Sequence, residues 1–273
     1  MVAGPPGVIA GGPSLAPKPG MPLRPFRELR RARSLVRWAF VVGGLCLSVG
    51  TAGAKTAYVG PHGNPIAALP VGSAKRLVIG VMGGAGSHVS EGLGRDIRAM
   101  GAEIAKAGHI TLTGACPGLP HEAIIGAKEA GGLTAGISGY ASKKAHVASG
   151  APTDHLDVVQ FTSLPFVHRG QSRPNYMGRE LDNIERSNAL LFVGGRSGTL
   201  GEFAIAYEEG RPIGVLRGSG GVSDEIAHLV KVMVKEGKPP RAPIVYDRDP
   251  RRLVRKLVKA TEEHKPAAFK WQG

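Results

Sequence analysis

The chain of 273 residues contains little cysteine, few aromatic residues and no familiar metal-binding motif. With 2 cysteines, Cys46 and Cys116, a scaffold held by several disulfides is excluded, and a chain of this length can bury a core without them. Aromatic residues make up 5% of the chain and form no stacking motif, so nucleic acid is not an expected partner. The 9 histidines form no H-x-x-x-H pair and the cysteines form no C-x-x-C pair, so we expect no metal site.

Two common phosphate-binding motifs are also missing. No P-loop with its lysine and serine occurs. The turn that begins at Gly83 reads Gly-Gly-Ala-Gly-Ser and lacks the third glycine of a dinucleotide fingerprint, and no following strand ends in an acid. We therefore expect no NAD and no other cofactor. These absences leave a site for a smaller phosphorylated ligand, such as a mononucleotide.

Basic residues outnumber acidic residues. The chain has 35 Lys and Arg and 21 Asp and Glu, which gives a net charge of +14. Residues 1–55 hold eight basic residues and one acidic residue, which accounts for +7 of that total. The rest of the excess is spread out, apart from a basic stripe at 251–259 on the last expected helix. A stripe of this kind is usually a solvated helix face.

The front of the chain predicts a leader. Residues 1–37 are rich in Gly and Pro and then in Arg, and we expect them to be disordered. The apolar segment 38–54 ends in an Ala-Gly-Ala sequence, which is the layout of a secretory signal peptide cleaved near Ala54, and its apolar core is short for a membrane span. One interpretation of this segment is that the protein is exported. The second interpretation is that the gene start lies upstream, or that an unusual leader precedes a cytosolic domain. Residues 55–74 are expected to be a linker, and residues 266–273 a tail.

Short apolar runs alternate with helical patterns from residue 76 onward. This alternation predicts a single doubly wound, Rossmann-like α/β domain over residues 75–265, with a mainly parallel sheet of about seven strands. Ligands of such sheets bind beyond the carboxyl ends of the strands. The expected strands are 76–82, 109–113, 133–137, 158–162, 189–193, 212–216 and 243–245.

Three of these strands end in glycine-rich turns that lead toward helices. Backbone N–H groups at a helix start have no partner inside the helix, and glycine lets a ligand come close to the backbone. The turns therefore predict a phosphate or nucleotide site. The candidate binding residues are Gly83, Gly84, Gly114, Gly118, Gly194, Gly195, Arg196, Ser197, Gly198 and Thr199.

The turn after strand 189–193 also holds an acid, Glu202. An ordinary strand-to-helix connection would explain this turn without a ligand. Thr199 and Glu202 have the spacing of a capping box, in which the carboxylate bonds back to the helix start and is not free for chemistry. If Glu202 instead lies free in the first helical turn, the helix dipole should keep it ionised, which suits a base or a charge stabiliser.

A wider pattern includes Arg179, which stands eight residues before Ser187-Asn188-Ala189. Together with residues 194–202, this arrangement resembles the LONELY GUY family of the SLOG superfamily, whose signature P-G-G-x-G-T-x-x-E follows an arginine and a Ser-Asp-Ala strand entry. Residues 113–121 resemble the second glycine turn of that family, G-G-G-x-x-G-L-M-G. The resemblance extends from Arg76 to about residue 258.

The resemblance implies a nucleotide-binding enzyme without a metal or cofactor. Its expected reaction is hydrolysis of the N-glycosidic bond of a nucleoside 5′-monophosphate such as AMP, giving free base and ribose 5-phosphate. Arg179 and Glu202 match the putative catalytic positions, with Arg179 holding phosphate or ribose and Glu202 stabilising the positive charge that develops on the sugar. Arg196 would add a phosphate contact or form a salt bridge that closes the pocket. The family also implies a homodimer.

Several positions depart from the family pattern. Gly194 replaces the signature proline, Arg196 its second glycine, Asn188 an aspartate, and Pro120-His121 a Met-Gly pair. These departures place the chain in a divergent branch, near the molybdenum-cofactor-carrier-like proteins. The alternative function is therefore a non-catalytic carrier of a nucleotide or of a pterin-type phosphorylated cofactor, and a third hypothesis is a protein that has kept the fold and lost the ligand.

Three other features have simple interpretations. Cys116 is expected to be a small buried thiol, because no histidine partner for it can be inferred. His121, at a helix start, is expected to be a surface residue. The segment 138–157 is rich in small and polar residues and is predicted to be a mobile lid.

Overall fold

A computed structural model describes residues 56–60, 63–69, 76–86, 89–162, 166–168 and 171–265. The leader predicted at 1–37, the apolar segment 38–54 and the tail 266–273 lie outside the described residues. Among the helices of the described ranges, none has the length and apolar character needed to cross a bilayer.

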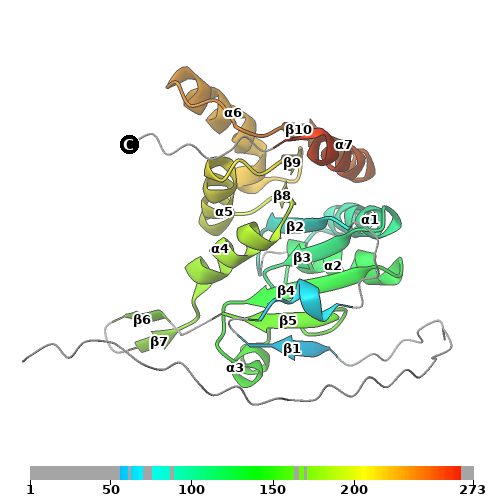
Figure 1. The fold of residues 1–273 in the computed structure, drawn as a ribbon, viewed down its shortest axis with the longest axis vertical. Helices are drawn as coiled ribbons and strands as arrows, with labels where there is room; N and C mark the ends of the chain where they lie inside the picture. The colour runs from blue at the N-terminus through cyan, green and yellow to red at the C-terminus, as the bar shows by residue number, and fades with distance from the viewer. Residues whose placement is uncertain are drawn as a thin grey trace, which may run out of the picture. The chain divides into compact units, whose positions relative to one another are not determined.

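The described residues form one large parallel sheet and a small hairpin (Figure 1). The order in the large sheet is β1-β5-β4-β3-β2-β8-β9-β10, and every neighbouring pair is parallel. The hairpin pairs β6 (Phe166–His168) with β7 (Gln171–Arg173). The strands of the large sheet are β1 (Ala57–Val59), β2 (Val78–Gly83), β3 (Ile110–Thr113), β4 (Leu133–Ser138), β5 (Val158–Phe161), β8 (Ala189–Val193), β9 (Ile213–Leu216) and β10 (Ile244–Asp247).

The predicted doubly wound fold is confirmed, and the expected count of strands was one too low. The additional strand is β1, which lies inside the segment predicted to be a linker and forms the edge of the sheet by pairing with β5. Its three residues are too short for a periodic pattern, and its place depends on a partner about 100 residues later in the chain. The same segment holds a short 3-10 helix at Ile66–Ala68.

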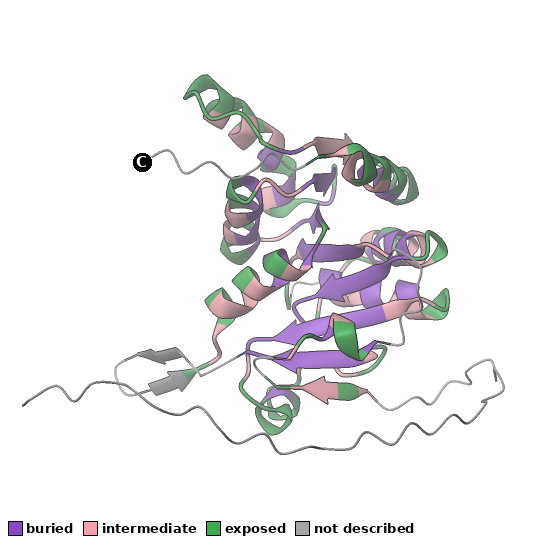
Figure 2. Cartoon of the chain, in the orientation of Figure 1, coloured by how far each residue is buried: buried purple, intermediate pink, exposed green. Residues whose placement is uncertain are grey.

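Helices cover both faces of the sheet, and the inner strands are almost entirely buried, whereas the outer strands β1 and β10 are partly exposed (Figure 2). In β8, Leu191 and Val193 join the core beneath α1, α2 and α7, whereas Leu190 and Phe192 join the core beneath α4, α5 and α6. The helices are α1 (Glu91–Lys106), α2 (Leu119–Glu129), α3 (Lys143–Ala148), α4 (Tyr176–Arg186), α5 (Ser197–Glu208), α6 (Gly221–Lys235) and α7 (Pro250–Glu263).

The order of the strands determines where a ligand can bind. From β2 the chain moves outward through β3, β4 and β5, and it then returns to the other side of β2 as β8. The connections that leave the carboxyl ends of β2 and β8 therefore diverge, which is the arrangement that creates the ligand crevice of open α/β sheets. The glycine turns after β2, β3 and β8 all lie at this edge.

The segment 138–157, predicted to be a mobile lid, contains the short helix α3, and its movement as a lid stays a prediction. The buried side chain of His146 holds this helix in place. Its Nε2 donates to the carbonyl of Pro152 at 3.1 Å, and its Nδ1 accepts from the Ser138 hydroxyl at 2.9 Å. Burial lowers the pKa of His146, so the imidazole is neutral, as this pair of hydrogen bonds requires.

Helices α1 and α2 touch through their backbones. A Cβ at Gly101 would lie 1.9 Å from the carbonyl oxygen of Ala123, and one at Gly126 would lie 2.0 Å from that of Arg98. Both distances are far below van der Waals contact, so any side chain at these positions would push the two helices apart.

We expect Gly101→Ala to destabilise the fold by about 1 to 3 kcal/mol, the usual cost of overpacking a core. The control is Gly92→Ala in the same helix, where no atom lies within 4 Å of the added methyl. That substitution should raise stability by up to about 1 kcal/mol, because alanine is the better helix former. Urea unfolding midpoints measure both effects, and equal midpoints for the two variants would contradict this packing.

Candidate functional site

A cavity of about 430 Å³ lies at the carboxyl ends of β2, β3 and β4. Its walls come from the turns after β2 and β3, from the end of β4, from the residues that follow α3, and from the first turns of α4. The volume is within the range of about 300 to 1,000 Å³ that is common for small-molecule sites. The cavity therefore lies where the strand order predicts a ligand.

The first two glycine turns are joined to each other by backbone hydrogen bonds. The Gly86 N–H donates to the Pro117 carbonyl at 3.0 Å, and the Leu119 N–H donates to the Gly84 carbonyl at 3.1 Å. Gly118 has a φ of 94°, and a Cβ there would lie 2.4 Å from the Gly84 oxygen. Gly84 and Gly118 thus shape the wall of the cavity without lining it.

Gly114 has a different role, because it lines the cavity and makes room for Arg179. A Cβ at Gly114 would lie 2.8 Å from Nη1 of Arg179. The side chain of Arg179 comes from α4, whose first turn is capped by the Asn175 carboxamide, and it is 11% exposed. Its Nε is buried and has no hydrogen-bond partner among the described residues. A buried donor without a partner is uncommon in folded proteins, which marks this guanidinium as a candidate for ligand binding.

Two carboxyl groups flank the Arg179 guanidinium. Its Nη2 lies 3.6 Å from Oε1 of Glu180 and 3.9 Å from Oε1 of Glu202. The structure therefore brings together the two residues, Arg179 and Glu202, that the sequence predicted as a catalytic pair. Glu180, which lines the cavity beside Arg179, was not predicted.

The capping-box interpretation of Glu202 was wrong. A capping box would place Thr199 at the N-cap, but α5 begins one turn earlier. The N-cap residue is Arg196, so Thr199 already lies inside the helix and Glu202 is in the second turn. The side chain of Glu202 is 6% exposed. It is free of the capping bond and faces Arg179.

The expectation that Glu202 stays ionised was also wrong. Burial, with a smaller contribution from the charge of Glu180, raises the pKa of Glu202 to about 7, although Arg179 lowers it. Asn183 lowers it slightly, although its amide makes no hydrogen bond of ordinary geometry. Burial outweighs the helix dipole here because the carboxyl lies beyond the first turn, where the dipole effect has faded.

The third glycine turn lies outside the cavity lining. The Gly194 N–H donates to the Ser219 hydroxyl at 2.9 Å, and its carbonyl accepts from the Ser223 hydroxyl at 2.7 Å. These bonds fasten the turn to the start of α6. A Cβ at Gly198 would lie 3.3 Å from Oε1 of Glu180, so the start of α5 faces this carboxyl.

Arg196 joins the third turn to the first. Its Nη2 donates to the carbonyl of Ala85 at 3.3 Å, and the residue is exposed. This hydrogen bond is not the salt bridge that the sequence suggested, and the phosphate contact of Arg196 stays a prediction. Of the predicted phosphate-binding residues, Gly114 lines the cavity, and the others support its walls or lie behind them: Gly83, Gly84, Gly118, Gly194, Gly195, Arg196, Ser197, Gly198 and Thr199.

Two tyrosines that the sequence did not single out form the outer wall. The rings of Tyr140 and Tyr176 are 6.5 Å apart at an angle of 83°, and the Arg179 guanidinium carbon lies 5.4 Å from the Tyr176 ring centroid. Their contact, together with burial, raises the pKa of Tyr176 to about 12. Aromatic faces at a cavity favour a planar ligand group. In the sequence these residues follow no periodic pattern.

Cys116 also lines the cavity. Burial raises the pKa of its thiol, and the nearby Arg179 only partly opposes this effect. The thiol is therefore mostly protonated at neutral pH and a weak nucleophile, in agreement with its interpretation as a structural residue.

The raised pKa of Glu202 predicts how stability depends on pH. The folded pKa of about 7 lies above the ordinary value of 4.5, so ionising the carboxyl between pH 5 and 8 should destabilise the folded state. Each unit of pKa shift corresponds to about 1.4 kcal/mol, so the free energy of unfolding falls by at most about 3 kcal/mol. This fall is complete above pH 8.

Glu202→Gln mimics the protonated carboxyl, so this variant should lose less stability than the parent chain between pH 5 and 8. Glu208→Gln, an exposed change on the same helix, is the control and should follow the parent. Chemical unfolding at several pH values measures the difference. Parallel pH curves for the parent and Glu202→Gln would show that Glu202 keeps an ordinary pKa.

Comparisons with known proteins agree with this architecture. Among curated protein sequences, none is significantly similar to the chain. The protein TM1055, from a structural genomics consortium, is 21% identical with a TM-score of 0.54, and the match covers 67% of this chain and 99% of TM1055. The molybdenum cofactor carrier protein MCP from Chlamydomonas reinhardtii is 25% identical with a TM-score of 0.51, over 69% of this chain and 100% of MCP.

A third similar structure is the molybdenum cofactor binding protein from Rippkaea orientalis, which is 23% identical with a TM-score of 0.50, over 68% of this chain and 98% of that one. These likenesses agree with the predicted position in the SLOG superfamily beside carriers of the molybdenum cofactor. Residues 76–254 match the family model of SLOG cluster4, and the chain therefore belongs to the SLOG cluster4 family.

Proposed function

We propose that the cavity binds a nucleoside 5′-monophosphate such as AMP and that Arg179 and Glu202 hydrolyse its N-glycosidic bond. The observation that carries this proposal is the buried pair itself, in which a carboxyl with a pKa of about 7 lies 3.9 Å from a guanidinium at the cavity wall. A carboxyl that titrates near neutral pH is suited to general acid–base catalysis. This reaction requires no cofactor.

Arg179 is the group proposed to hold the phosphate. It lines the cavity, its Nε lacks a protein partner among the described residues, and its planar fork matches phosphate oxygens. The rings of Tyr140 and Tyr176 would contact the base. The phosphate and the base thus have different partners within one cavity.

In the proposed reaction, the N-glycosidic bond breaks and its electron pair leaves with the base, which takes up a proton from Glu202. Water adds to the anomeric carbon, and the proton that it loses returns to Glu202. Positive charge develops on the sugar in the transition state, and the carboxylate that Glu202 becomes as it gives up its proton stabilises this charge. Arg179 lowers the pKa of Glu202, so a phosphate that draws the guanidinium away would raise this pKa. Glu202 would then be protonated and able to supply the proton that the base requires.

A second candidate function is a non-catalytic carrier of a phosphorylated pterin-type cofactor. The similarity to the C. reinhardtii carrier favours it, as does the position of Glu202, which is buried behind Arg179 and does not itself line the cavity. In that case the Arg179–Glu202 pair would position the guanidinium for binding only.

The test uses the full chain with AMP, GMP, CMP and UMP, and measures free base by chromatography. We expect base release from at least one nucleotide, and a loss of about 100-fold or more in Glu202→Gln, the usual contribution of an acid–base residue. Glu208→Gln should retain the parent rate, because Glu208 is exposed and paired with Lys238.

Thermal shift with the same nucleotides separates the two candidates. For a hydrolase, Glu202→Gln should still be stabilised by nucleotide while it releases no base. For a carrier, no variant would release base, and the parent would be stabilised by ligand. Neither base release nor stabilisation by any nucleotide would contradict the proposal of a nucleotide site.

A homodimer is also part of the proposal. Met177 is 74% exposed and Leu181 is 55% exposed, one turn apart on α4, and Leu200 on the neighbouring α5 is 39% exposed. Large apolar side chains grouped on adjacent helices are typical of protein interfaces.

Light scattering of the full chain should therefore give the mass of a dimer. Leu181→Glu should shift it to the monomer, because a charge would be buried in the interface. Val234→Glu, an exposed apolar residue on α6, is the control and should leave the dimer intact. A monomeric parent chain would contradict the proposed assembly.

A further inference from the structure

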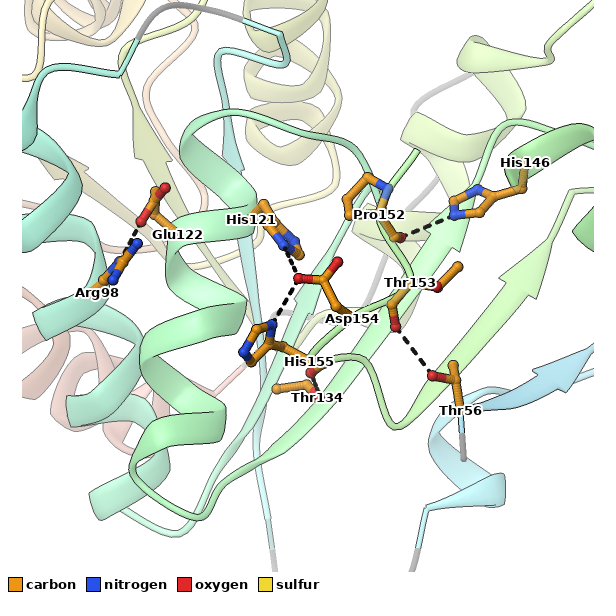
Figure 3. Close-up of polar contacts among 10 residues, drawn as sticks. All are labelled: Thr56, Arg98, His121, Glu122, Thr134, His146, Pro152, Thr153, Asp154 and His155. Carbon is orange, nitrogen blue, oxygen red and sulfur yellow. Dashed lines mark hydrogen bonds and ion pairs between the residues drawn. The ribbon is translucent and has the colours of Figure 1, made fainter. Parts of the chain in front are cut away.

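Three side chains converge on one point at the surface near α2 and the loop before β5 (Figure 3). Nε2 of His121 lies 3.3 Å from Oδ2 of Asp154, and Nδ1 of His155 lies 2.9 Å from the same oxygen. The three atoms all lie within 4.8 Å of one another. None of these residues belongs to the proposed nucleotide site.

The loop that carries Asp154 and His155 is held along its backbone. The Pro152 carbonyl accepts from His146 Nε2 at 3.1 Å, and the Thr153 carbonyl accepts from the Thr56 hydroxyl at 3.1 Å. The His155 carbonyl accepts from the Thr134 hydroxyl at 2.6 Å. These hydrogen bonds come from three separate segments of the chain (Figure 3). The positions of Asp154 and His155 are therefore fixed before any ligand arrives.

His155 has a φ of 61°, in the left-handed region that residues other than glycine rarely adopt. Such a conformation is unfavourable for most residues and persists only where the surroundings impose it. Here it turns the imidazole of His155 toward the carboxylate of the preceding residue. Its stabilisation by Thr134 indicates that the arrangement of the three side chains is specified by the fold.

We propose that His121, Asp154 and His155 bind a divalent transition metal ion, with zinc as the best match. Two imidazole nitrogens and one carboxylate oxygen are common zinc ligands, and bonds of about 2.0 to 2.1 Å in tetrahedral geometry place the ligand atoms about 3.3 Å apart. The two observed nitrogen–oxygen separations, 3.3 Å and 2.9 Å, are close to this spacing. Nitrogen ligands disfavour magnesium and calcium, which prefer oxygen.

The exposure of the three ligands leaves room for further ligands. The side chain of Asp154 is 61% exposed, that of His155 is 40% exposed, and that of His121 is 14% exposed. Water or a small molecule can therefore complete the coordination. The sequence analysis predicted no metal site, because residues 121, 154 and 155 lack the short spacing of a metal motif and meet only in the folded chain.

The site also connects two walls of the cavity. His121 lies in the first turn of α2, directly after the glycine turn 114–118, and Asp154 follows the cavity residues Ser149 and Ala151. A metal ion would tie these two walls together at a point outside the cavity. This inference does not depend on which ligand the cavity binds.

The experiment titrates the full chain, freed of metal with EDTA, with zinc sulfate in competition with a chromophoric chelator. We expect the parent to bind one zinc ion per chain. The affinity for zinc should fall by more than about tenfold in His121→Ala and in His155→Asn, because even the loss of a residue that only supports a metal ligand lowers affinity about tenfold. Asparagine tolerates the left-handed backbone at 155, so this variant keeps the fold. His228→Ala, an exposed histidine on α6, is the control and should bind as the parent does.

Cobalt supplies an independent spectroscopic measurement. Cobalt(II) bound to the parent should give visible absorption bands of a nitrogen and oxygen site, and these bands should be lost in His155→Asn and kept in His228→Ala. Magnesium sulfate at the same concentration should not displace cobalt. Zinc binding that is absent, or that is equal in the parent, His121→Ala and His155→Asn, would overturn the proposal.

Discussion

The candidate site depends on one guanidinium that faces two mostly buried carboxyl groups. If Glu180 and Glu202 were both ionised, Arg179 would leave one negative charge without balance in a region of low solvent access. Burial raises the pKa of both carboxyls, so the proton that restores neutrality is held within the site, chiefly on Glu202. The glycine at position 114 and the Asn175 cap of α4 matter because they place this guanidinium.

Much of the fold could be predicted from the sequence, because its signals are local. The apolar runs of β2, β3, β4, β5, β8 and β9 are almost entirely buried, and most of them lead into a helical pattern. The strand β1 could not be predicted, since three residues, Ala57–Val59, carry no period and are a strand only through pairing with β5. The helix α3 was missed for a related reason, because the bonds of His146 to Ser138 and Pro152 are tertiary contacts.

The candidate site was predicted in part. The spacing of Arg179 and Glu202 relative to the glycine turn was enough to pair them, although the turn itself lies behind the cavity lining. Glu180 and the two tyrosines were missed because they reach the cavity from α4 and from the end of β4, and no local pattern marks them. The pKa of Glu202 could not be predicted either, because it depends on burial, which only the folded chain defines.

The backbone contact of α1 with α2 determines how the cavity can change shape. Because Gly101 and Gly126 leave no side chain between the two helices, α1 and α2 behave as one rigid body, and the turn at Gly118 and the side chain of His121 are attached to it. The opposite wall comes from α4 and the segment after β4. We therefore expect a change in the shape of the cavity to come from Tyr140, in the segment after β4, and from Tyr176, on α4, while the turn before α2 remains stationary.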